Sequence, residues 1–200
     1  MEYRLFRRRI LSAALTTIAC VVALLPGAAV QAQAAADAPR TCEGNNKWFR
    51  LQNGNSNKYL LPNTQSPTKS GVGVRQYYDP DFYPSTWSRW CMLDDTRGYV
   101  NLVNAATPNW YAMTISTSSD YDGWINKPVI VYPRSTSNVL QSWRILPGKY
   151  SNVRMITNPT TKQCLRMFDR QTADNVQLYA YDQSLCDYND EAQMWIIKYD

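Results

Sequence analysis

The chain of 200 residues contains no histidine. This absence excludes Ser-His-Asp hydrolysis, Cys-His proteolysis, a histidine general base and histidine-ligated zinc. Glutamate is nearly as scarce, since only Glu43 and Glu191 lie beyond the N-terminal segment. A carboxylate pair for glycoside hydrolysis would have to come from loop aspartates, which we interpret as solvated turn residues: Asp79, Asp81, Asp120 and Asp122. The composition therefore predicts a protein that is not an enzyme and needs no cofactor.

Only one long apolar run occurs, and it lies near the N-terminus. Arginines precede a run from Ile10 to about Leu25, and Ala32-Gln33-Ala34 has the small-x-small form of a cleavage site. This pattern predicts a secretory signal peptide over residues 1–34 rather than a membrane anchor, and hence a secreted protein. Arg7-Arg8 also permits export by the twin-arginine route instead of the general secretory route. We expect a flexible tether over 35–46, a folded domain over 47–200, and no integral membrane segment after cleavage.

Charge of one sign does not dominate the chain. Its 21 basic and 16 acidic residues give a formal net charge of +5, but cleavage would remove four arginines and Glu2 and leave about +2. We interpret the remaining charges as interspersed without runs, a pattern that does not favour nucleic acid or an anionic membrane as partner.

Three tryptophans recur with one period. Trp90, Trp143 and Trp195 stand 53 and 52 residues apart, and Leu60, Ala112 and Leu165 stand 52 and 53 apart. Each tryptophan closes a short motif: Ser88-Arg89-Trp90, Gln141-Ser142-Trp143 and Gln193-Met194-Trp195. Two sets of landmarks with one period predict three copies of one unit of about 52 residues, over about 47–95, 96–148 and 149–200.

The hydrophobic pattern of the domain has period two in short runs bounded by Asn, Asp, Ser, Pro and Gly. This is typical of short β-strands, and helical periodicity is not sustained beyond two turns. Four strands are expected in each repeat: 48–51, 59–61, 72–74 and 88–92; 100–103, 110–113, 129–132 and 141–145; 153–156, 163–165, 176–179 and 193–197. The prediction is an all-β domain whose repeats close a barrel, with the tryptophans, Leu60, Ala112 and Leu165 in the shared core.

Four cysteines lie beyond the signal segment: Cys42, Cys91, Cys164 and Cys186. An even count in an exported chain is typical of disulfides. Cys164 and Cys186 belong to one repeat and are expected to pair, which leaves Cys42 with Cys91. Metal binding is the alternative, although the chain has neither histidine nor a Cys-x-x-Cys pair.

These motifs resemble those of ricin B-type lectin domains, which have a β-trefoil fold. The Gln-x-Trp motifs carry the resemblance, with the Cys164-Leu165 strand and the Val176-Gln177-Leu178-Tyr179 strand. It covers residues 48–199, and it implies a structural role for Gln141 and Gln193. Ser88 stands where the first repeat should have glutamine.

The resemblance also implies a sugar pocket in each repeat. In the family, an aspartate follows Cys-Leu, an aromatic platform closes the Val-Gln-Leu strand, and an asparagine precedes Gln-x-Trp. Here Leu61, Met113 and Arg166 take the aspartate position, and Trp87, Leu140 and Ala192 take the asparagine position. The platform position holds Arg75, Tyr132 and Tyr179. Because only Tyr132 and Tyr179 keep a family feature, we expect them to act as secondary stacking platforms without the family's polar groups.

Residues 76–87, which we call the aromatic stretch, carry more rings than a connection needs. The rings are those of Tyr77, Tyr78, Phe82, Tyr83 and Trp87. One interpretation is an exposed ligand-binding surface. The alternative is that Tyr77, Phe82 and Trp87 close the flank of the trefoil. Smaller versions occur at Tyr121, Trp124 and Tyr188.

The sequence leaves three functions open. The first is a secreted, non-catalytic module that binds glycans or glycoconjugates. The second is the receptor-binding or scaffold subunit of a bacterial toxin, because an exported trefoil with an aromatic stretch also resembles the lectin-like subunits of cytolethal distending toxins. Its partner would then be a toxin protein. The third is a trefoil protease inhibitor, which the Gln-x-Trp motifs disfavour.

Overall fold

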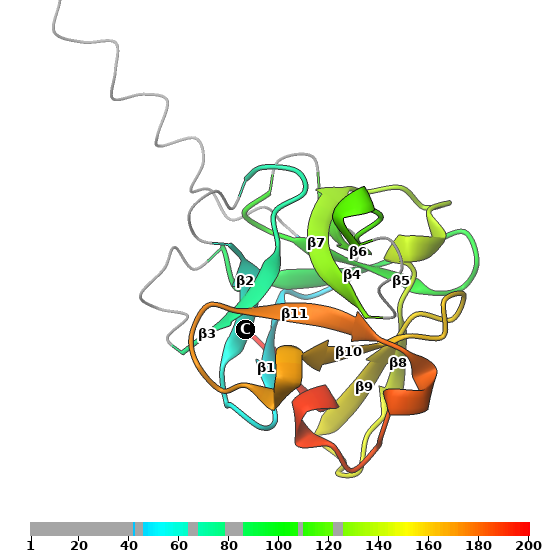
Figure 1. Ribbon diagram of the computed structural model, residues 1–200. Coiled ribbons are helices and arrows are strands. Elements are labelled where there is room, and N and C mark those ends of the chain that lie inside the picture. Colours follow the sequence, from blue (N-terminus) through cyan, green and yellow to red (C-terminus); the bar gives the residue numbers. More distant parts are fainter. Residues whose placement is uncertain (1–41, 43–45, 64–67, 79–85, 108–109, 122–125) are drawn as a thin grey trace, which may run out of the picture. The chain divides into compact units, whose positions relative to one another are not determined.

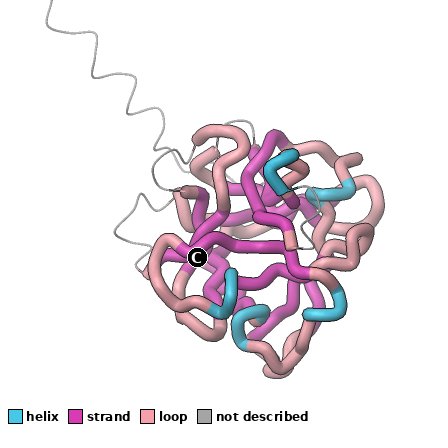
Figure 2. The backbone as a smooth tube through the Cα atoms, in the orientation of Figure 1, coloured by secondary structure: helices cyan, strands magenta, loops and turns pink. Residues whose placement is uncertain are grey.

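The structure, a computed structural model, describes residues 42, 46–63, 68–78, 86–107, 110–121 and 126–200. They belong to one compact unit, Ala36–Asp200. Within these residues the secondary structure is all-β, with twelve strands and five short 3-10 helices (Figure 1). The strands occupy the middle of the unit, and loops and short helices surround them (Figure 2). No helix in the described ranges is long and apolar enough to cross a membrane.

The strands follow one another with short connections. Residues 47–95 contain β1 (Phe49–Asn53), β2 (Tyr59–Pro62), β3 (Val74–Tyr77) and β4 (Trp90–Asp94). Residues 96–148 contain β5 (Val100–Asn104), β6 (Tyr111–Ile115), β7 (Lys127–Pro133) and β8 (Arg144–Pro147), with η1 (Ser119–Tyr121) and η2 (Val139–Gln141). Residues 149–200 contain β9 (Val153–Thr157), β10 (Cys164–Met167), β11 (Val176–Tyr181) and β12 (Trp195–Tyr199), with η3 (Phe168–Arg170), η4 (Gln183–Leu185) and η5 (Glu191–Gln193). We call these ranges the first, middle and last segments.

All strand pairings are antiparallel and join the strands into one sheet. The first strand of each segment pairs with the last strand of the preceding one: β5 with β4, β9 with β8, and β1 with β12. The second and third strands of each segment form hairpins, β2–β3, β6–β7 and β10–β11. Strand β11 pairs with both β3 and β7, so the three hairpins meet (Figure 1).

Three buried tryptophans organise the core. Trp90, Trp143 and Trp195 are 0% exposed, and each donates its indole N–H to a backbone carbonyl thirty residues earlier. The acceptors are Leu60 at 2.8 Å, Met113 at 2.9 Å and Leu165 at 3.3 Å. A buried indole needs such an acceptor, so each ring ties the end of its segment to that segment's second strand.

Two details of the predicted register are wrong. Met113, not Ala112, enters the main core, because successive side chains of β6 point to opposite faces and Ala112 packs with Cys91 and Val103. The third strand of the first segment begins at Val74 instead of running over 72–74. Gly71 has φ +81°, and the backbone of Val72 accepts a hydrogen bond from Val131, so this stretch meets β7 before β3 pairs with β2.

Three buried asparagines join the segments to one another. Asn53 and Asn104 end the first strand of their segments, Asn158 directly follows β9, and all three are at most 1% exposed. Their amides donate to carbonyls just before the tryptophan of the preceding segment, which are those of Ala192, Trp87 and Val139. Their side-chain oxygens accept amide hydrogens of the turn that follows. Each asparagine therefore holds the turn that follows it and also joins two segments.

Both predicted disulfides are present, Cys42–Cys91 and Cys164–Cys186. The first lies in a small cluster with Trp48 and Trp110, whose rings stack at 6.0 Å with 5° between their planes. The second links β10 to the loop after β11, beside Met155 and Tyr181. Within the described residues, no group of His, Cys, Asp and Glu is arranged to hold a metal ion.

Candidate functional site

A pocket in the middle segment brings an exposed ring together with hydroxyl groups. Its volume is about 340 Å³, and Tyr132 on β7 forms one wall with 49% of its surface exposed. The remaining lining comes from the end of β6 and the residues after it, from Ile130, and from the turn before Gln141: Thr114, Ile115, Ser116, Thr117, Ser118, Asn138 and Leu140, with Gly71. We call it the Tyr132 pocket.

Most polar groups of the Tyr132 pocket are held by the protein itself. Thr114 Oγ1 donates to the Ala112 carbonyl and accepts from Gln141 Nε2. Asn138 Oδ1 accepts the Leu140 amide hydrogen and caps η2, while its side-chain nitrogen donates to no group in the described part of the chain. That nitrogen and the hydroxyl hydrogen of Ser116 can serve a ligand, because both belong to side chains whose positions are already fixed.

Among the described residues, the lining contains no carboxylate and no Lys or Arg side chain. The nearest acid along the chain, Asp120, accepts a hydrogen bond from Ser118 Oγ at 3.1 Å. The described part of the lining is therefore neutral, with one aromatic face, apolar walls and hydroxyl and amide groups. This combination suits a neutral polyhydroxylated ligand rather than an ion.

The hydrogen bond of Trp143 identifies which residue takes the family's aspartate position here. Because Met113, not Ala112, is equivalent to Leu60 and Leu165, the residue after it is Thr114. The prediction that Met113 occupies this position is wrong by one residue. Thr114 pairs with Ile130, as Arg166 pairs with Tyr179 and Leu61 with Arg75, so Ile130 takes the platform position and Tyr132 lies two residues beyond it. Thr114, Ile130 and Leu140 line the same pocket as Tyr132. The sequence analysis missed Thr114, although the constant interval of thirty residues to each tryptophan identifies it.

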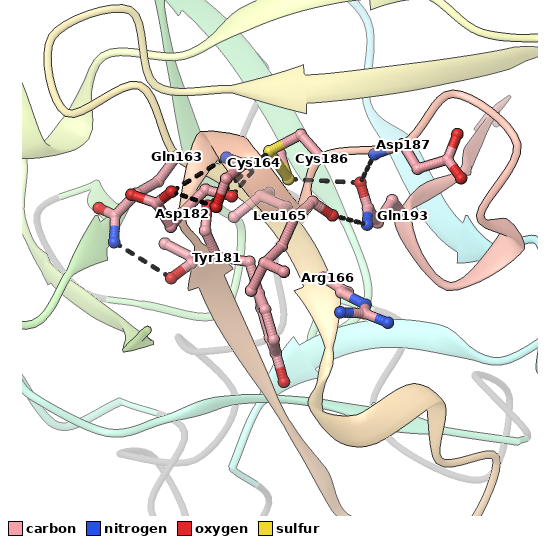
Figure 3. Close-up of a disulfide and its surroundings, with 12 residues drawn as sticks. Gln163, Cys164, Leu165, Arg166, Tyr181, Asp182, Cys186, Asp187 and Gln193 are labelled. Carbon is pink, nitrogen blue, oxygen red and sulfur yellow. Dashed lines mark hydrogen bonds between the residues drawn. A yellow bond between two sulfur atoms is a disulfide. The ribbon is translucent and has the colours of Figure 1, made fainter. Parts of the chain in front are cut away.

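Gln141 and Gln193 hold the loops beside their tryptophans. Gln141 Oε1 accepts the Ser135 amide hydrogen, and its Nε2 donates to Thr114 Oγ1 and to the Pro133 carbonyl. Gln193 likewise accepts from the Asp187 amide and donates to the Leu185 carbonyl (Figure 3). Ser88 is buried but too short to reach a loop, and its hydroxyl has no partner in the described residues.

In the last segment, the protein's own side chains fill the corresponding position. Arg166 forms an ion pair with Asp190 at 3.0 Å and lies 4.8 Å above the Tyr181 ring. Tyr179, half-buried, packs against Phe168 with ring centroids 5.1 Å apart. An ionised Arg–Asp pair replaces the family's free acceptor, so this position offers an aromatic surface without a free carboxylate.

In the first segment, the residue at the platform position joins the first segment to the last one. Arg75 donates to the side chain of Asn175 at 3.0 Å, and Leu61, at the aspartate position, is 0% exposed. Tyr77 is 5% exposed and donates its hydroxyl to Asn175 Oδ1 at 2.7 Å. Because the Tyr77 ring has no exposed face, it belongs to the packing between the first and last segments, as the alternative interpretation expects of this residue.

The rest of the aromatic stretch is only partly described. Tyr78 is 69% exposed, and Trp87 is half-buried with its carbonyl bonded to Asn104. Phe82 and Tyr83 lie outside the described residues, as do Trp124 and the side chain of Tyr121. The described part therefore offers one strongly exposed ring, that of Tyr78.

Comparison with known proteins identifies the class. Residues 34–132 match the model of the family described as ricin-type beta-trefoil lectin domain-like. The designed threefold-symmetric protein ThreeFoil has the same fold, with a TM-score of 0.63 and 20% identity over 76% of this chain and 97% of that one. The C-half of the earthworm R-type lectin in complex with GalNAc gives 0.57 and 13% over 77% and 99%. A chain of the Haemophilus ducreyi cytolethal distending toxin gives 0.57 and 15% over 76% and 83%.

A comparison with curated proteins finds no match. The family match and the shared fold confirm the resemblance to ricin B-type β-trefoil lectin domains. Over residues 34–132 the chain is thus similar to ricin-type beta-trefoil lectin-like domains.

Proposed function

We propose that residues 47–200 are a β-trefoil of three four-strand repeats that acts as a non-catalytic carbohydrate-binding module, with the Tyr132 pocket as its sugar site. The observation that carries this proposal is the pocket itself. An exposed ring, a side-chain amide with no partner among the described residues, and hydroxyl groups line one cavity together with Thr114 and Leu140, which stand at two of the positions that the resemblance assigns to a sugar pocket. The earthworm lectin of the same fold was solved in complex with GalNAc, which supports the same ligand class here.

Stacking would supply most of the affinity. The Tyr132 ring packs against the apolar face of a sugar, which contributes about 1–3 kcal/mol, and Asn138 and Ser116 orient it through hydrogen bonds worth about 1 kcal/mol each. Without a carboxylate acceptor, we expect a single-site Kd of about 1 mM, which corresponds to roughly −4 kcal/mol. A volume of about 340 Å³ matches one sugar residue rather than a long oligosaccharide.

A glycan array followed by NMR titration with the best neutral monosaccharide tests this site. Tyr132→Ala should weaken binding about tenfold or more, while Tyr132→Phe, which keeps the ring, should retain it. Tyr150→Ala is the matched control, because Tyr150 is equally exposed at 54% but lies outside the pocket. Equal binding by Tyr132→Ala and the native protein would sink the assignment.

The proposal includes secretion. The signal peptide expected over residues 1–34 would lead to an oxidising compartment, where disulfides such as Cys42–Cys91 and Cys164–Cys186 persist. Mass spectrometry of the protein from culture medium should give an N-terminus at Ala35. A protein that retains residues 1–34 would contradict this part of the proposal.

A toxin subunit is the second candidate. The observations that favour it are the fold shared with a chain of the cytolethal distending toxin and the exposed ring of Tyr78 in the aromatic stretch. In this case the stretch would dock a protein partner, and the Tyr132 pocket would be secondary. A pull-down from the native secretome decides between the two candidates. Capture of a defined protein that is lost in Tyr78→Ser, together with an empty glycan array, would favour the toxin subunit.

A further inference from the structure

Charge is segregated along the chain from the middle segment into the last one. Residues 123–168 contain seven basic residues and no Asp or Glu, and six acidic residues follow within 169–191. The basic residues are Lys127, Arg134, Arg144, Lys149, Arg154, Lys162 and Arg166. The interpretation of the charges as interspersed without runs is wrong for this part of the chain. Four of these residues lie on the β8–β9 hairpin and the turn after it, which therefore forms a cationic region of the fold.

A cavity of about 270 Å³ opens between this hairpin and the loop that follows β11. Leu146 and Met155 contribute apolar lining from β8 and β9. Cys186 lines the opposite side, where its disulfide with Cys164 fixes the loop (Figure 3). Tyr188 on the same loop is 51% exposed and forms an aromatic wall. We call this the β8–β9 cavity.

Two cations line the β8–β9 cavity and both are anchored. Arg144 lies 5.3 Å from the centre of the Tyr99 ring and donates to the Tyr99 hydroxyl. Lys162 stands in a left-handed conformation, φ +62°, in a turn that the buried Asn158 side chain holds through amide hydrogen bonds. The Lys162 ammonium has no hydrogen bond or ion pair with the described part of the chain, so its charge is available.

Among the described residues, the lining of the β8–β9 cavity includes Arg144 and Lys162 but no Asp or Glu. The two acids nearest along the loop bond to its own backbone. Asp182 accepts the Ser184 amide hydrogen, and Asp187 accepts that of Asn189. The carboxylate of Asp187 points away from the disulfide (Figure 3). The described lining thus combines two cationic side chains with an apolar floor and one aromatic wall.

We propose that the β8–β9 cavity binds a carboxylate-bearing sugar residue, as a second site separate from the Tyr132 pocket. Arg144 and Lys162 pair with the carboxylate through charge-assisted hydrogen bonds. Tyr188 and the apolar floor cover the sugar's apolar face, and Thr157 and Gln183 offer hydroxyl and amide groups to its ring hydroxyls. A free inorganic anion would contact only the two cations. The anion and the sugar should therefore differ in which residues they affect.

The probe is D-glucuronate, with D-glucose as the neutral match and sulfate as the simple anion, titrated into the native full domain by NMR. Glucuronate should shift the amide resonances of Lys162, Gln183 and Tyr188, and glucose should not. Lys162→Gln should weaken glucuronate binding about tenfold, and its affinity should fall as salt rises from 50 to 300 mM. Lys149→Gln removes one charge from the same hairpin outside the cavity and should leave affinity unchanged.

Three outcomes would overturn the proposal. Glucuronate and glucose could shift the same resonances equally, Lys149→Gln could weaken binding as much as Lys162→Gln, or sulfate could bind as tightly as glucuronate. The proposal shares only the ligand class with the function proposed for the Tyr132 pocket. Tyr132→Ala should leave glucuronate binding intact, so failure of either site is seen separately.

Discussion

The indole N–H of Trp143 donates to the carbonyl of Met113 at 2.9 Å, inside a core where both residues are fully buried. Trp143→Ala removes the ring and leaves that carbonyl without a partner. We expect a loss of about 3–5 kcal/mol in the free energy of unfolding, measured by denaturant titration. Trp48→Ala is the contrast, since Trp48 is half-buried and its ring stacks on that of Trp110 outside the main core. An equal loss in the two variants would contradict the role assigned to the buried ring.

The asparagine hydrogen bonds that join the segments predict a second loss of stability. Asn104→Ala removes donors to the carbonyls of Trp87 and Arg89 and an acceptor for the Ala106 amide. Because these groups are buried, stability should fall by about 2–3 kcal/mol. Asn152→Ala, in an exposed turn, should change stability by no more than about 0.5 kcal/mol. A thermal melt of both variants compares them directly.

Asp95 links stability to pH. Burial raises the pKa of Asp95, but hydrogen bonds from Ser142, the Tyr99 and Arg97 amides and the Arg97 side chain outweigh it, so the pKa lies below the ordinary value of 3.8. A carboxyl group whose folded pKa is depressed stabilises the fold fully above pH 3.8, and this stabilisation is lost as pH falls through the folded pKa.

Asp95→Asn should therefore be less stable than the native protein at pH 7, by roughly 1–3 kcal/mol, and the difference should shrink below pH 3.8. Urea unfolding at a series of pH values measures it. Asp94→Asn, at an exposed neighbouring position, should show almost no difference at any of these pH values. A gap between Asp95→Asn and the native protein that stays constant down to pH 2 would contradict the assigned ionisation.

The Cys164–Cys186 disulfide closes a loop with a sequence separation of 22 residues. Replacing both cysteines by serine should lower the free energy of unfolding by about 3 kcal/mol, because the unfolded chain regains conformational freedom. Non-reducing peptide mapping of the native protein should show this pair and Cys42–Cys91. A Cys91–Cys164 cross-link would contradict both.

The aromatic stretch can be tested separately from the pockets. Replacing Tyr78, Phe82 and Tyr83 by serine should leave the melting temperature unchanged and abolish binding if the stretch is the principal ligand surface. Tyr77→Phe is the contrast, since it removes the hydrogen bond to Asn175 and should cost about 1 kcal/mol of stability without affecting binding. Unfolding of the triple variant would show that these rings belong to the core.

Much of the fold could be predicted from periodic residues. The tryptophans and the cysteine pairs are landmarks because few other residue types can fill a large buried site or form a covalent link. The one-residue error at Ala112 concerns two apolar neighbours on β6 that differ by one residue in their intervals to Leu60 and Leu165. Met113 stands 53 residues after Leu60 and 52 before Leu165, the same intervals that separate Trp90, Trp143 and Trp195. Two apolar neighbours on one strand are distinguished only by which face is buried.

The sites were harder to predict because they depend on contacts between distant segments. Nothing local in the sequence shows that Asn175 would accept the Tyr77 hydroxyl, or that Asp190 would pair with Arg166. The β8–β9 cavity had a sequence signal, the stretch without carboxylates, but its apolar floor and the loop carrying Tyr188 come together only in the folded chain. Residues that bind a ligand through the shape of a cavity can thus be recognised only after the fold is known.

Strand β1 pairs with β12 from Phe49 opposite Tyr199 to Asn53 opposite Trp195, and the Asp200 amide donates to the Trp48 carbonyl. The two ends of the folded domain are therefore adjacent. A circularly permuted chain, joined there by a short linker and opened in the exposed turn at Tyr150–Asn152, keeps every strand pairing of the native domain. The order of the segments along the chain can therefore be changed, while their arrangement around the three tryptophans is determined by packing.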